Sequence, residues 1–360
     1  MNYEIVKQAL KNPSRILYRF RDQLLKRYNI DSLVDYPVRY YPSKLHKPRI
    51  LLAIARYDYG DVSRGISFEE NNFLHSLIHS GYEVVAFDTL GTGNKYGIKM
   101  MNDLLVENVY RWNPEVVFFF LFRDEILTKT LTRLTDDIGI HTINWFADDH
   151  WRFEIFSKKY SPYFSYVVTT DRDALERYNE IGVKNVIHSQ WACNHYLYRR
   201  MNTNQENDVT FIGQPHGDRR SVINRIADAG LEVGTYGFGW HTGKLSTYQM
   251  IEMFNKTKIN LNLSNSSRGK HDQIKGRDFE IPGCGGFMLR AANPHLGEYF
   301  DIGKELIVYD TVDDLIDKIR YYLKHPEERD AVRDAAYRRV LREHTYEIRF
   351  EKIFKMVMKK

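Results

Sequence analysis

The chain has 360 residues, of which 43% are hydrophobic and 14% aromatic, so it can bury a sizeable core and long disordered stretches are excluded. At roughly 150 residues per domain, this length favours two domains. The two cysteines stand far apart, which excludes a disulfide framework or a cysteine zinc site and favours a reducing compartment.

The formal net charge of +5 is concentrated at the N-terminus, where residues 1–49 hold eleven Lys and Arg against four Asp and Glu. We predict a basic helical extension over residues 1–48. On a helical wheel of residues 15–28, apolar and basic side chains occupy opposite sides. Such a helix could lie on an anionic membrane surface, or its apolar stripe could pack on the protein itself. Because no apolar run has the length of a signal peptide or membrane span, we expect a cytoplasmic protein, peripheral at the membrane under the first alternative.

From residue 49 onward, runs rich in β-branched and aromatic residues alternate with longer amphipathic stretches, a pattern typical of parallel sheets covered by helices. The first series of predicted strands comprises residues 49–56, 82–90, 114–122, 141–148, 164–171 and 185–192. The polar stretch 199–208 lacks apolar periodicity and marks a domain boundary. The second series comprises residues 209–214, 231–239, 259–265, 286–291 and 305–310.

These patterns predict an α/β fold with two Rossmann-like, doubly wound domains, residues 49–198 and 199–345, followed by a last helix in 346–360. Open parallel sheets bind ligands at the carboxyl ends of their strands, so the loops of both domains could face one interdomain cleft. The residues that follow each strand are therefore the candidate site residues.

The loop after strand 209–214 reads GQPHGDRR and leads into a predicted helix. Gly213 and Gly217 would let backbone N–H groups approach a phosphate, and Arg219 would add a bidentate positive charge at the helix start. The alternative is an ordinary strand-to-helix turn with a solvated arginine pair.

The stretch HDQIKGRDFEIPGCGG, residues 271–286, places charged side chains directly before a glycine-rich turn. Lys275 and Arg277 could neutralise a diphosphate, and the Glu280 carboxylate could accept hydrogen bonds from a ribose diol. Asp272 lies on roughly the same helical face as Glu280. The alternative is a solvated face on which Lys275 pairs with an acid.

Two further segments follow strands of the first domain. Asp148, Asp149 and His150 could supply a general base or bind a divalent metal, or one aspartate could cap a helix. Ser67 and Glu69 could hold a phosphate or the acceptor, although Ser67 also fits the N-cap of a capping box. The sequence contains no HExxH, GxSxG or P-loop motif, which argues against hydrolases and NTPases.

In the second half of the chain, Arg277 precedes Phe-Glu, a small-residue turn follows at Gly283–Gly286, and the segments GKELIVYD, HPEER and EHTYEIR come next in order. In this series of motifs the chain resembles the C-terminal module of glycosyltransferase group 1 proteins of the spore-maturation, CgeB-like type. Upstream, the segments SFEENNFLHSLIHSGYEVVAFD, WFADDH and YGFGW also resemble their counterparts. The resemblance covers nearly everything after residue 49.

This resemblance implies a GT-B fold, in which the second domain binds the nucleotide-sugar donor, the first binds the acceptor, and the last helix returns to the first domain. By carry-over, Glu280 would bind the donor ribose, Arg219 and Lys275 would hold the diphosphate, and the turn at Gly283 would belong to the donor site. Asp272 stands where many relatives carry a longer glutamate.

We therefore expect a glycosyltransferase of cell-surface glycan biosynthesis, acting on a glycan, lipid-linked sugar or protein. No metal, other cofactor or nucleic-acid partner is expected. Asp149 is our first choice of base if configuration inverts, with Asp148 and His150 as the other candidates and Ser67 and Glu69 on the acceptor side. The alternatives are a non-catalytic sugar-nucleotide-binding or interaction protein with the same fold, and a metal-dependent transferase or hydrolase.

Overall fold

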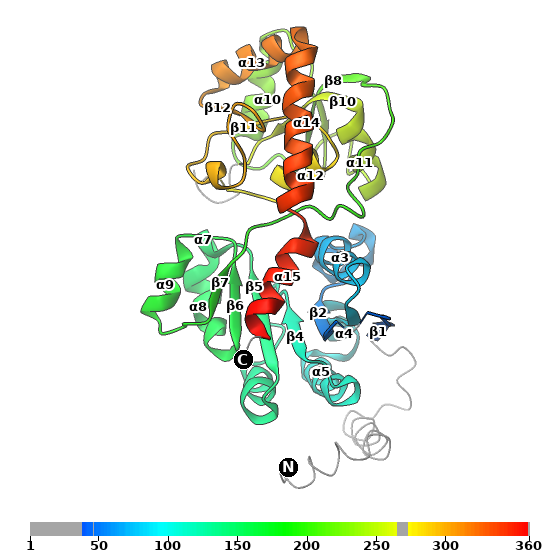
Figure 1. Cartoon of the computed structure of the whole chain (residues 1–360), viewed down its shortest axis with the longest axis vertical. Helices are drawn as coiled ribbons and strands as arrows, with labels where there is room; N and C mark the ends of the chain where they lie inside the picture. The colour runs from blue at the N-terminus through cyan, green and yellow to red at the C-terminus, as the bar shows by residue number, and fades with distance from the viewer. Residues whose placement is uncertain (1–37, 46, 265–272, 359–360) are drawn as a thin grey trace. The chain divides into compact units, whose positions relative to one another are not determined.

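The computed structural model describes residues 38–45, 47–264 and 273–358 (Figure 1). The amphipathic helix predicted over residues 15–28, with its membrane contact, lies outside the described residues, and so does Asp272. No helix in the described part of the chain is both long and apolar enough to cross a bilayer. The chain divides into two compact units, which we describe separately: unit 1 runs to Ser189 and resumes at Ile353, and unit 2 is Gln190–Lys352.

Within the described residues, unit 1 contains a seven-stranded sheet in the order β1-β3-β2-β4-β5-β6-β7. Every neighbouring pair is parallel except β1 and β3. The strands are β1 (Val38–Tyr41), β2 (Arg49–Ile54), β3 (Glu83–Asp88), β4 (Val116–Phe119), β5 (His141–Phe146), β6 (Tyr166–Thr169) and β7 (Val186–His188). Each strand predicted for this unit is present, and each is shorter than its apolar run because the run continues into the following loop or helix.

Strand β1 was not predicted, because residues 38–41 were assigned to the basic helical extension. In the structure they pair antiparallel with β3, with Val38 opposite Phe87 and Tyr41 opposite Val84. The segment VRYY is rich in residues that favour strands, and this local preference outweighs the basic composition of its surroundings. Arg39 on β1 also forms an ion pair with Glu70, in which Nη2 donates to Oε2 at 2.7 Å.

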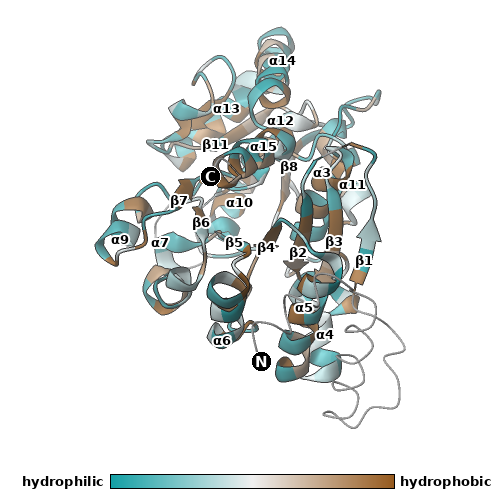
Figure 2. Ribbon diagram, turned by 60° about the horizontal axis from the view of Figure 1, so that its bottom comes forward, coloured by the Kyte–Doolittle hydropathy of each residue, from teal (hydrophilic) through white to brown (hydrophobic). Residues whose placement is uncertain are grey.

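The core of unit 1 forms where helices cover the parallel strands. Leu51, Val85 and Phe119 are completely inaccessible to solvent, and Met101 and Leu104 of α5 pack in the same apolar cluster. The central strands β2 and β4 appear in the brown of hydrophobic residues in Figure 2. The helices of unit 1 are η1 (Asp58–Gly60), η2 (Val62–Arg64), η3 (Glu70–Leu74), α3 (His75–His79), α4 (Thr89–Tyr96), α5 (Ile98–Trp112), α6 (Thr128–Thr132), η4 (Arg133–Ile138), α7 (Asp149–Arg152), η5 (Phe153–Ser157), α8 (Lys158–Tyr160), η6 (Ser161–Tyr163) and α9 (Ala174–Glu180).

In unit 2, the described residues form a parallel five-stranded sheet in the order β12-β11-β10-β8-β9. All the strands predicted for this unit are present: β8 (Asn207–Ile212), β9 (Gly234–Tyr236), β10 (Thr257–Asn262), β11 (Met288–Ala291) and β12 (Ile307–Tyr309). The helices are α10 (Arg219–Asp228), α11 (Thr247–Lys256), α12 (Arg277–Gly283), η7 (Leu296–Glu298), α13 (Val312–Lys324), α14 (Pro326–Glu343) and the start of α15 (Tyr346–Val357). The predicted α/β fold with two parallel-sheet units is confirmed.

Unit 2 begins at Gln190, several residues before the boundary that we placed at residue 199. The reason is a short parallel bridge between Cys193 and Thr345. The Cys193 N–H donates to the carbonyl of His344 at 2.8 Å, and the Tyr346 N–H donates to the carbonyl of Cys193 at 3.1 Å. These bonds attach residues 190–198 to the second unit, although their sequence reads as the end of the first.

Candidate functional site

The loop after β8 carries two of the predicted glycines, and they differ in what they do. The Gly213 N–H donates to the carbonyl of Tyr236 at 2.8 Å, and the Gly213 carbonyl accepts from Nε1 of Trp240 at 2.7 Å. The N–H of Gly213 is therefore used in holding the loop against β9. Gly217 is exposed and has a φ of +57°, a left-handed conformation that favours glycine.

Arg219 is the first residue of α10 and is nearly buried. Its Nη1 donates to the carbonyl of Gln214 at 2.7 Å, and its guanidinium lies 5.5 Å from the centre of the Phe211 ring. Burial lowers its pKa, but an arginine keeps its charge at neutral pH even so. The predicted alternative of a solvated arginine is wrong for Arg219, which is a fixed positive charge.

Lys275, in the segment before α12, belongs to the same electrostatic environment as the β8 loop. The pKa of His216 is lowered first by partial burial and then by the positive charges of Arg219 and Lys275. Lys275 is also linked to the sheet, because Asp278 accepts from both the Lys275 N–H and Nδ2 of Asn262 at the end of β10, the parallel neighbour of β8. The diphosphate role of Arg219 and Lys275 stays a prediction. His216 is a neighbour that the sequence analysis missed, although it lies inside the GQPHGDRR loop.

Glu280 and Arg277 form a second group on α12. The Glu280 side chain is fully buried and pairs with Nη1 of Arg277, so the predicted solvated face is wrong for this acid. Arg277 also contacts Sδ of Met250 at 2.9 Å. Burial and the negative charge of Glu280 raise the pKa of Tyr198 well above its ordinary value. The ribose role of Glu280 stays a prediction.

Sequence reasoning missed a buried ion pair between Asp278 and Arg290. Both side chains are fully buried, and Nε of Arg290 lies 2.8 Å from Oδ1 of Asp278. Arg290 belongs to the otherwise apolar strand segment MLRA of β11. A charge inside an apolar strand is the signal that could have revealed it, because such a charge needs a buried partner.

Gly283 packs against Cys193. A Cβ atom added to Gly283 would lie 2.3 Å from Sγ of Cys193, and Val340 of α14 is also close. Close packing alone therefore explains why a glycine occupies this position in the small-residue turn. Its place in the donor site stays a prediction.

Asp149 is completely buried at the start of α7. Its Oδ2 accepts hydrogen bonds from the hydroxyls of Thr169 at 2.6 Å and Tyr178 at 2.8 Å. Burial raises its pKa to about 6, against the opposing hydrogen bonds of Ser157, Thr169 and Tyr178. These contacts are those of an internal carboxylate that anchors α7 to β6 and α9.

The two neighbours of Asp149 in the predicted base segment are partly exposed. Asp148 occupies the N-cap position of α7 without a side-chain capping hydrogen bond, and its charge acts on Arg152. His150 lies beside the Trp151 ring, with the ring centres 6.5 Å apart. Across the described residues, no three His, Cys, Asp or Glu side chains gather in an arrangement that could hold a metal ion.

Ser67 caps a helix as predicted, but only half of the capping box is present. The Ser67 hydroxyl accepts from the Glu70 N–H at 3.0 Å and donates to the carbonyl of Ala55 at 2.6 Å. The Glu70 carboxylate pairs with Arg39 instead of returning to the cap. Glu69 is partly buried, and burial raises its pKa to about 7.

Comparisons with known proteins agree with this architecture. Residues 219–355 match the family described as glycosyl transferase-like. Spore protein CgeB of Bacillus subtilis (strain 168) is 24% identical over 241 residues, which are 59% of this chain and 73% of that protein.

Two solved structures share the fold. Sucrose-phosphate synthase from Thermosynechococcus elongatus superposes with a TM-score of 0.62 at 9% identity, over 87% of this chain and 99% of that one. Anabaena HepE, solved in complex with UDP-glucose, superposes with a TM-score of 0.59 at 10% identity, over 87% of this chain and all of that one. The matches to CgeB and to the glycosyl transferase-like family confirm the predicted resemblance. The two solved structures show that the chain has the GT-B fold.

Proposed function

We propose that this chain is a glycosyltransferase that moves a sugar from a nucleotide-sugar donor to a glycan, lipid-linked or protein acceptor, and that unit 2 binds the donor diphosphate. The observation that carries the residue assignment is the placement of Arg219 and Lys275 at the same edge of one sheet. Arg219 follows β8, and Asp278 links the Lys275 N–H to Asn262 at the end of β10, the parallel neighbour of β8. The match to the glycosyl transferase-like family begins at Arg219 and includes Lys275. Because HepE was solved with UDP-glucose, UDP-sugars are the first donors to test.

The chemistry follows from charge. Cleavage of the bond between sugar and phosphate leaves negative charge on the departing diphosphate, and positive groups held in place stabilise it. Arg219 is held by the Gln214 carbonyl and the Phe211 ring, so it needs little reorganisation. The N-terminus of α10, which begins at Arg219, adds positive potential.

For the acceptor side, the proposal moves the base from Asp149 to its neighbours. A general base must reach the proton that it abstracts, and Asp149 is enclosed by its own hydrogen-bond partners. Asp148 and His150 are partly exposed and are the candidates if configuration inverts. Ser67 and Glu69 remain on the acceptor side. A cytoplasmic location, with membrane contact through residues 1–48, and a role in cell-surface glycan biosynthesis complete the proposal.

Isothermal titration of the full chain with UDP and GDP tests the donor site. We expect the wild type to bind, and Lys275→Ala and Arg219→Ala each to weaken binding by about 10- to 100-fold, since a charge-assisted hydrogen bond contributes about 1.5–3 kcal/mol. Arg225→Ala is the matched control, because Arg225 lies on the same helix but pairs with Asp313 at 2.6 Å on the surface. Wild-type affinity in both test variants, or no binding at all, would contradict the proposal.

A second measurement separates an enzyme from a non-catalytic binder with the same fold. A transferase should release nucleotide slowly from a UDP-sugar even without its acceptor, because water can replace the acceptor hydroxyl. Release should fall in Lys275→Ala and persist in Arg225→Ala. Tight binding without any release across a panel of nucleotide sugars would favour the binder.

A further inference from the structure

The Asp278 and Arg290 pair lies between the sheet of unit 2 and the segment that carries Lys275. Asp278 is the second residue of α12, and its carboxylate meets polar groups of several described residues. Oδ2 accepts from the backbone N–H of Lys275 at 2.7 Å, and Oδ1 accepts from Nδ2 of Asn262 at 2.8 Å. Oδ1 also lies 2.8 Å from Nε of Arg290.

Arg290 extends the same network to the neighbouring backbone. Its Nη2 donates to the carbonyl of Gln273 at 2.9 Å, and its Nη1 donates to the carbonyl of Ala291 at 2.8 Å. Arg290 is also the register partner of Asn262 across β10 and β11. One arginine and one amide, side by side at the carboxyl ends of adjacent strands, therefore hold both Asp278 and the chain just before α12.

Stability alone does not explain these charges. A buried ion pair gives little or no net stabilisation relative to apolar side chains of similar volume, because both charges lose their hydration. The network does constrain the backbone, because Arg290 bonds to the carbonyl of Gln273 and Asp278 bonds to the N–H of Lys275. It fixes where the Lys275 side chain starts, at the edge of the sheet from which the β8 loop that carries Arg219 also leaves, since β8 and β10 are parallel neighbours.

Another buried arginine of unit 2 has different partners, so burial of an arginine does not by itself produce this arrangement. Arg329 on α14 is also nearly buried, and its Nη1 donates to the carbonyl of Tyr322 at 2.9 Å. Its Nη2 donates to Oε1 of Gln205 at 3.3 Å. None of these partners is a predicted donor ligand, so Arg329 provides a matched comparison.

We infer that Asp278 and Arg290 are positioning residues of the donor site, which fix the backbone of Lys275 so that its ammonium group meets the donor diphosphate. This inference rests on the proposed function. It assigns a binding role to two residues that do not contact the donor, and it predicts that their loss impairs recognition of phosphate rather than of nucleoside.

The test is the ratio of dissociation constants for UMP and UDP, or for GMP and GDP if the wild type binds only guanosine nucleotides. The two ligands of a pair differ by one phosphate, so the ratio isolates the contribution of that phosphate to binding. A smaller folded fraction changes both dissociation constants equally and therefore leaves the ratio unchanged. Asp278→Asn keeps the shape of the side chain and removes its charge. We expect it to lower the ratio about fivefold or more, and Lys275→Ala to lower it similarly.

A double variant tests whether Asp278 acts through Lys275. If it does, adding Asp278→Asn to Lys275→Ala leaves the ratio of the single Lys275 variant unchanged. Arg329→Met should lower the melting temperature but keep the wild-type ratio. Asn262→Ala removes one neutral hydrogen-bond donor to Asp278, so it should also lower the ratio, but by less than Asp278→Asn does. This variant replaces Asp278→Asn in the test if Asp278→Asn does not fold.

The outcomes separate the two proposals. A wild-type ratio in folded Asp278→Asn or, where that variant does not fold, in Asn262→Ala would overturn the positioning role and leave the donor site intact. A further fall of the ratio in the double variant would also overturn it, because Asp278 would then act independently of Lys275. Failure of the wild type to bind any of the four nucleotides would overturn the proposed function, and this inference with it.

Discussion

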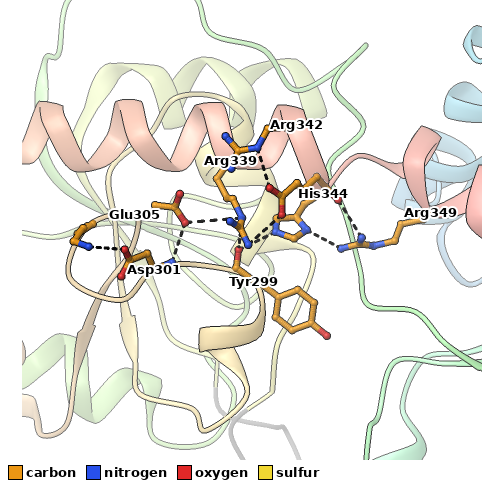
Figure 3. Close-up of polar contacts among 9 residues, drawn as sticks. Tyr299, Asp301, Glu305, Arg339, Arg342, His344 and Arg349 are labelled. Atoms are coloured by element: carbon orange, nitrogen blue, oxygen red, sulfur yellow. Dashed lines mark hydrogen bonds and ion pairs between the residues drawn. The ribbon is translucent and has the colours of Figure 1, made fainter.

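Nη2 of Arg349 lies 3.0 Å from Nδ1 of His344, and because arginine can only donate, this imidazole nitrogen is the acceptor (Figure 3). The other ring nitrogen, Nε2, lies 2.8 Å from the carbonyl of Tyr299 and therefore carries the proton. Arg349 also donates to the carbonyls of Gln190 at 3.1 Å and Glu343 at 3.2 Å. The pair joins the end of α14, the start of α15 and the first residue of unit 2, with His344 neutral.

This arrangement predicts acid sensitivity. Burial, and then the charge of Arg349, lower the pKa of His344 from 6.5 to about 4. Between these values the unfolded chain binds a proton that the folded protein does not, so stability decreases as the pH falls from 6.5 towards 4. The pKa difference corresponds to a loss of about 3 kcal/mol, measurable by urea unfolding across this range.

Two variants identify the source of this pH dependence. His344→Gln should be less stable than the wild type at pH 7, because a buried hydrogen bond is lost, but its stability should vary less between pH 6.5 and 4. His295→Gln is the control, since His295 is a partly exposed histidine of the same unit and should keep the wild-type slope. An unchanged slope in His344→Gln would contradict the assignment.

Gly283 gives a prediction about packing. In Gly283→Ala the new Cβ would meet Sγ of Cys193 at 2.3 Å inside a buried cluster, and overpacking of this kind costs about 1–3 kcal/mol. Cys193→Ala added to Gly283→Ala should recover part of that loss in urea unfolding, because it removes the sulfur. Gly297→Ala is the control, since no atom of the described residues lies within 4 Å of its Cβ position. A Gly283→Ala protein of full stability that no longer binds nucleotide would instead indicate a direct ligand role.

The sequence predicted the strands well because a strand of a parallel sheet is buried on both faces and shows as one local apolar run. β4, with the sequence VVFF, is an example. It predicted β1 badly, because the partner of Val38 is Phe87, far along the chain, and only that pairing shows that the segment is a sheet edge. Charge composition described the surroundings of β1 and not the strand itself.

For the candidate site, too, some residues could be predicted from the sequence and others could not. Residue type was enough to select Arg219 and Lys275, since a diphosphate needs positive charge next to a strand end. Residue type could not reveal the different partners of Asp278 and Glu280. The two acids stand two positions apart and therefore point to different sides of the helix, but the sequence does not show what lies on each side. Only the fold shows that Asp278 pairs with Arg290 and Glu280 with Arg277.

Removal of divalent ions gives a prediction about catalysis. If Arg219 and Lys275 neutralise the leaving diphosphate, turnover of the preferred nucleotide sugar should continue in EDTA at the rate measured without it. Lys275→Ala should turn over slowly under both conditions. Loss of wild-type turnover in EDTA, restored by added Mg²⁺ or Mn²⁺, would favour the metal-dependent alternative that uses Asp148 and Asp149.

For Asp149 we predict a pH dependence of stability that runs opposite to that of His344. Its pKa is raised from 3.8 to about 6, so the folded protein holds this proton more tightly than the unfolded chain does. The contribution of this group to stability therefore falls as the pH rises from 3.8 to 6, by about 3 kcal/mol at most. Asp149→Asn cannot ionise, so relative to the wild type it should gain stability between pH 4 and pH 7 in urea unfolding.

The same variant also tests the choice of base. Removal of a general base lowers turnover by about 10²- to 10⁴-fold, whereas loss of a structural carboxylate in a protein that stays folded should have a much smaller effect. We therefore expect Asp149→Asn, assayed at pH 7, to retain most of its turnover, and Asp148→Asn or His150→Gln to lose it if configuration inverts. Loss of turnover in a folded Asp149→Asn with unchanged nucleotide affinity would return the role of base to Asp149, and its hydrogen bonds from Thr169 and Tyr178 would then tune the base rather than anchor α7.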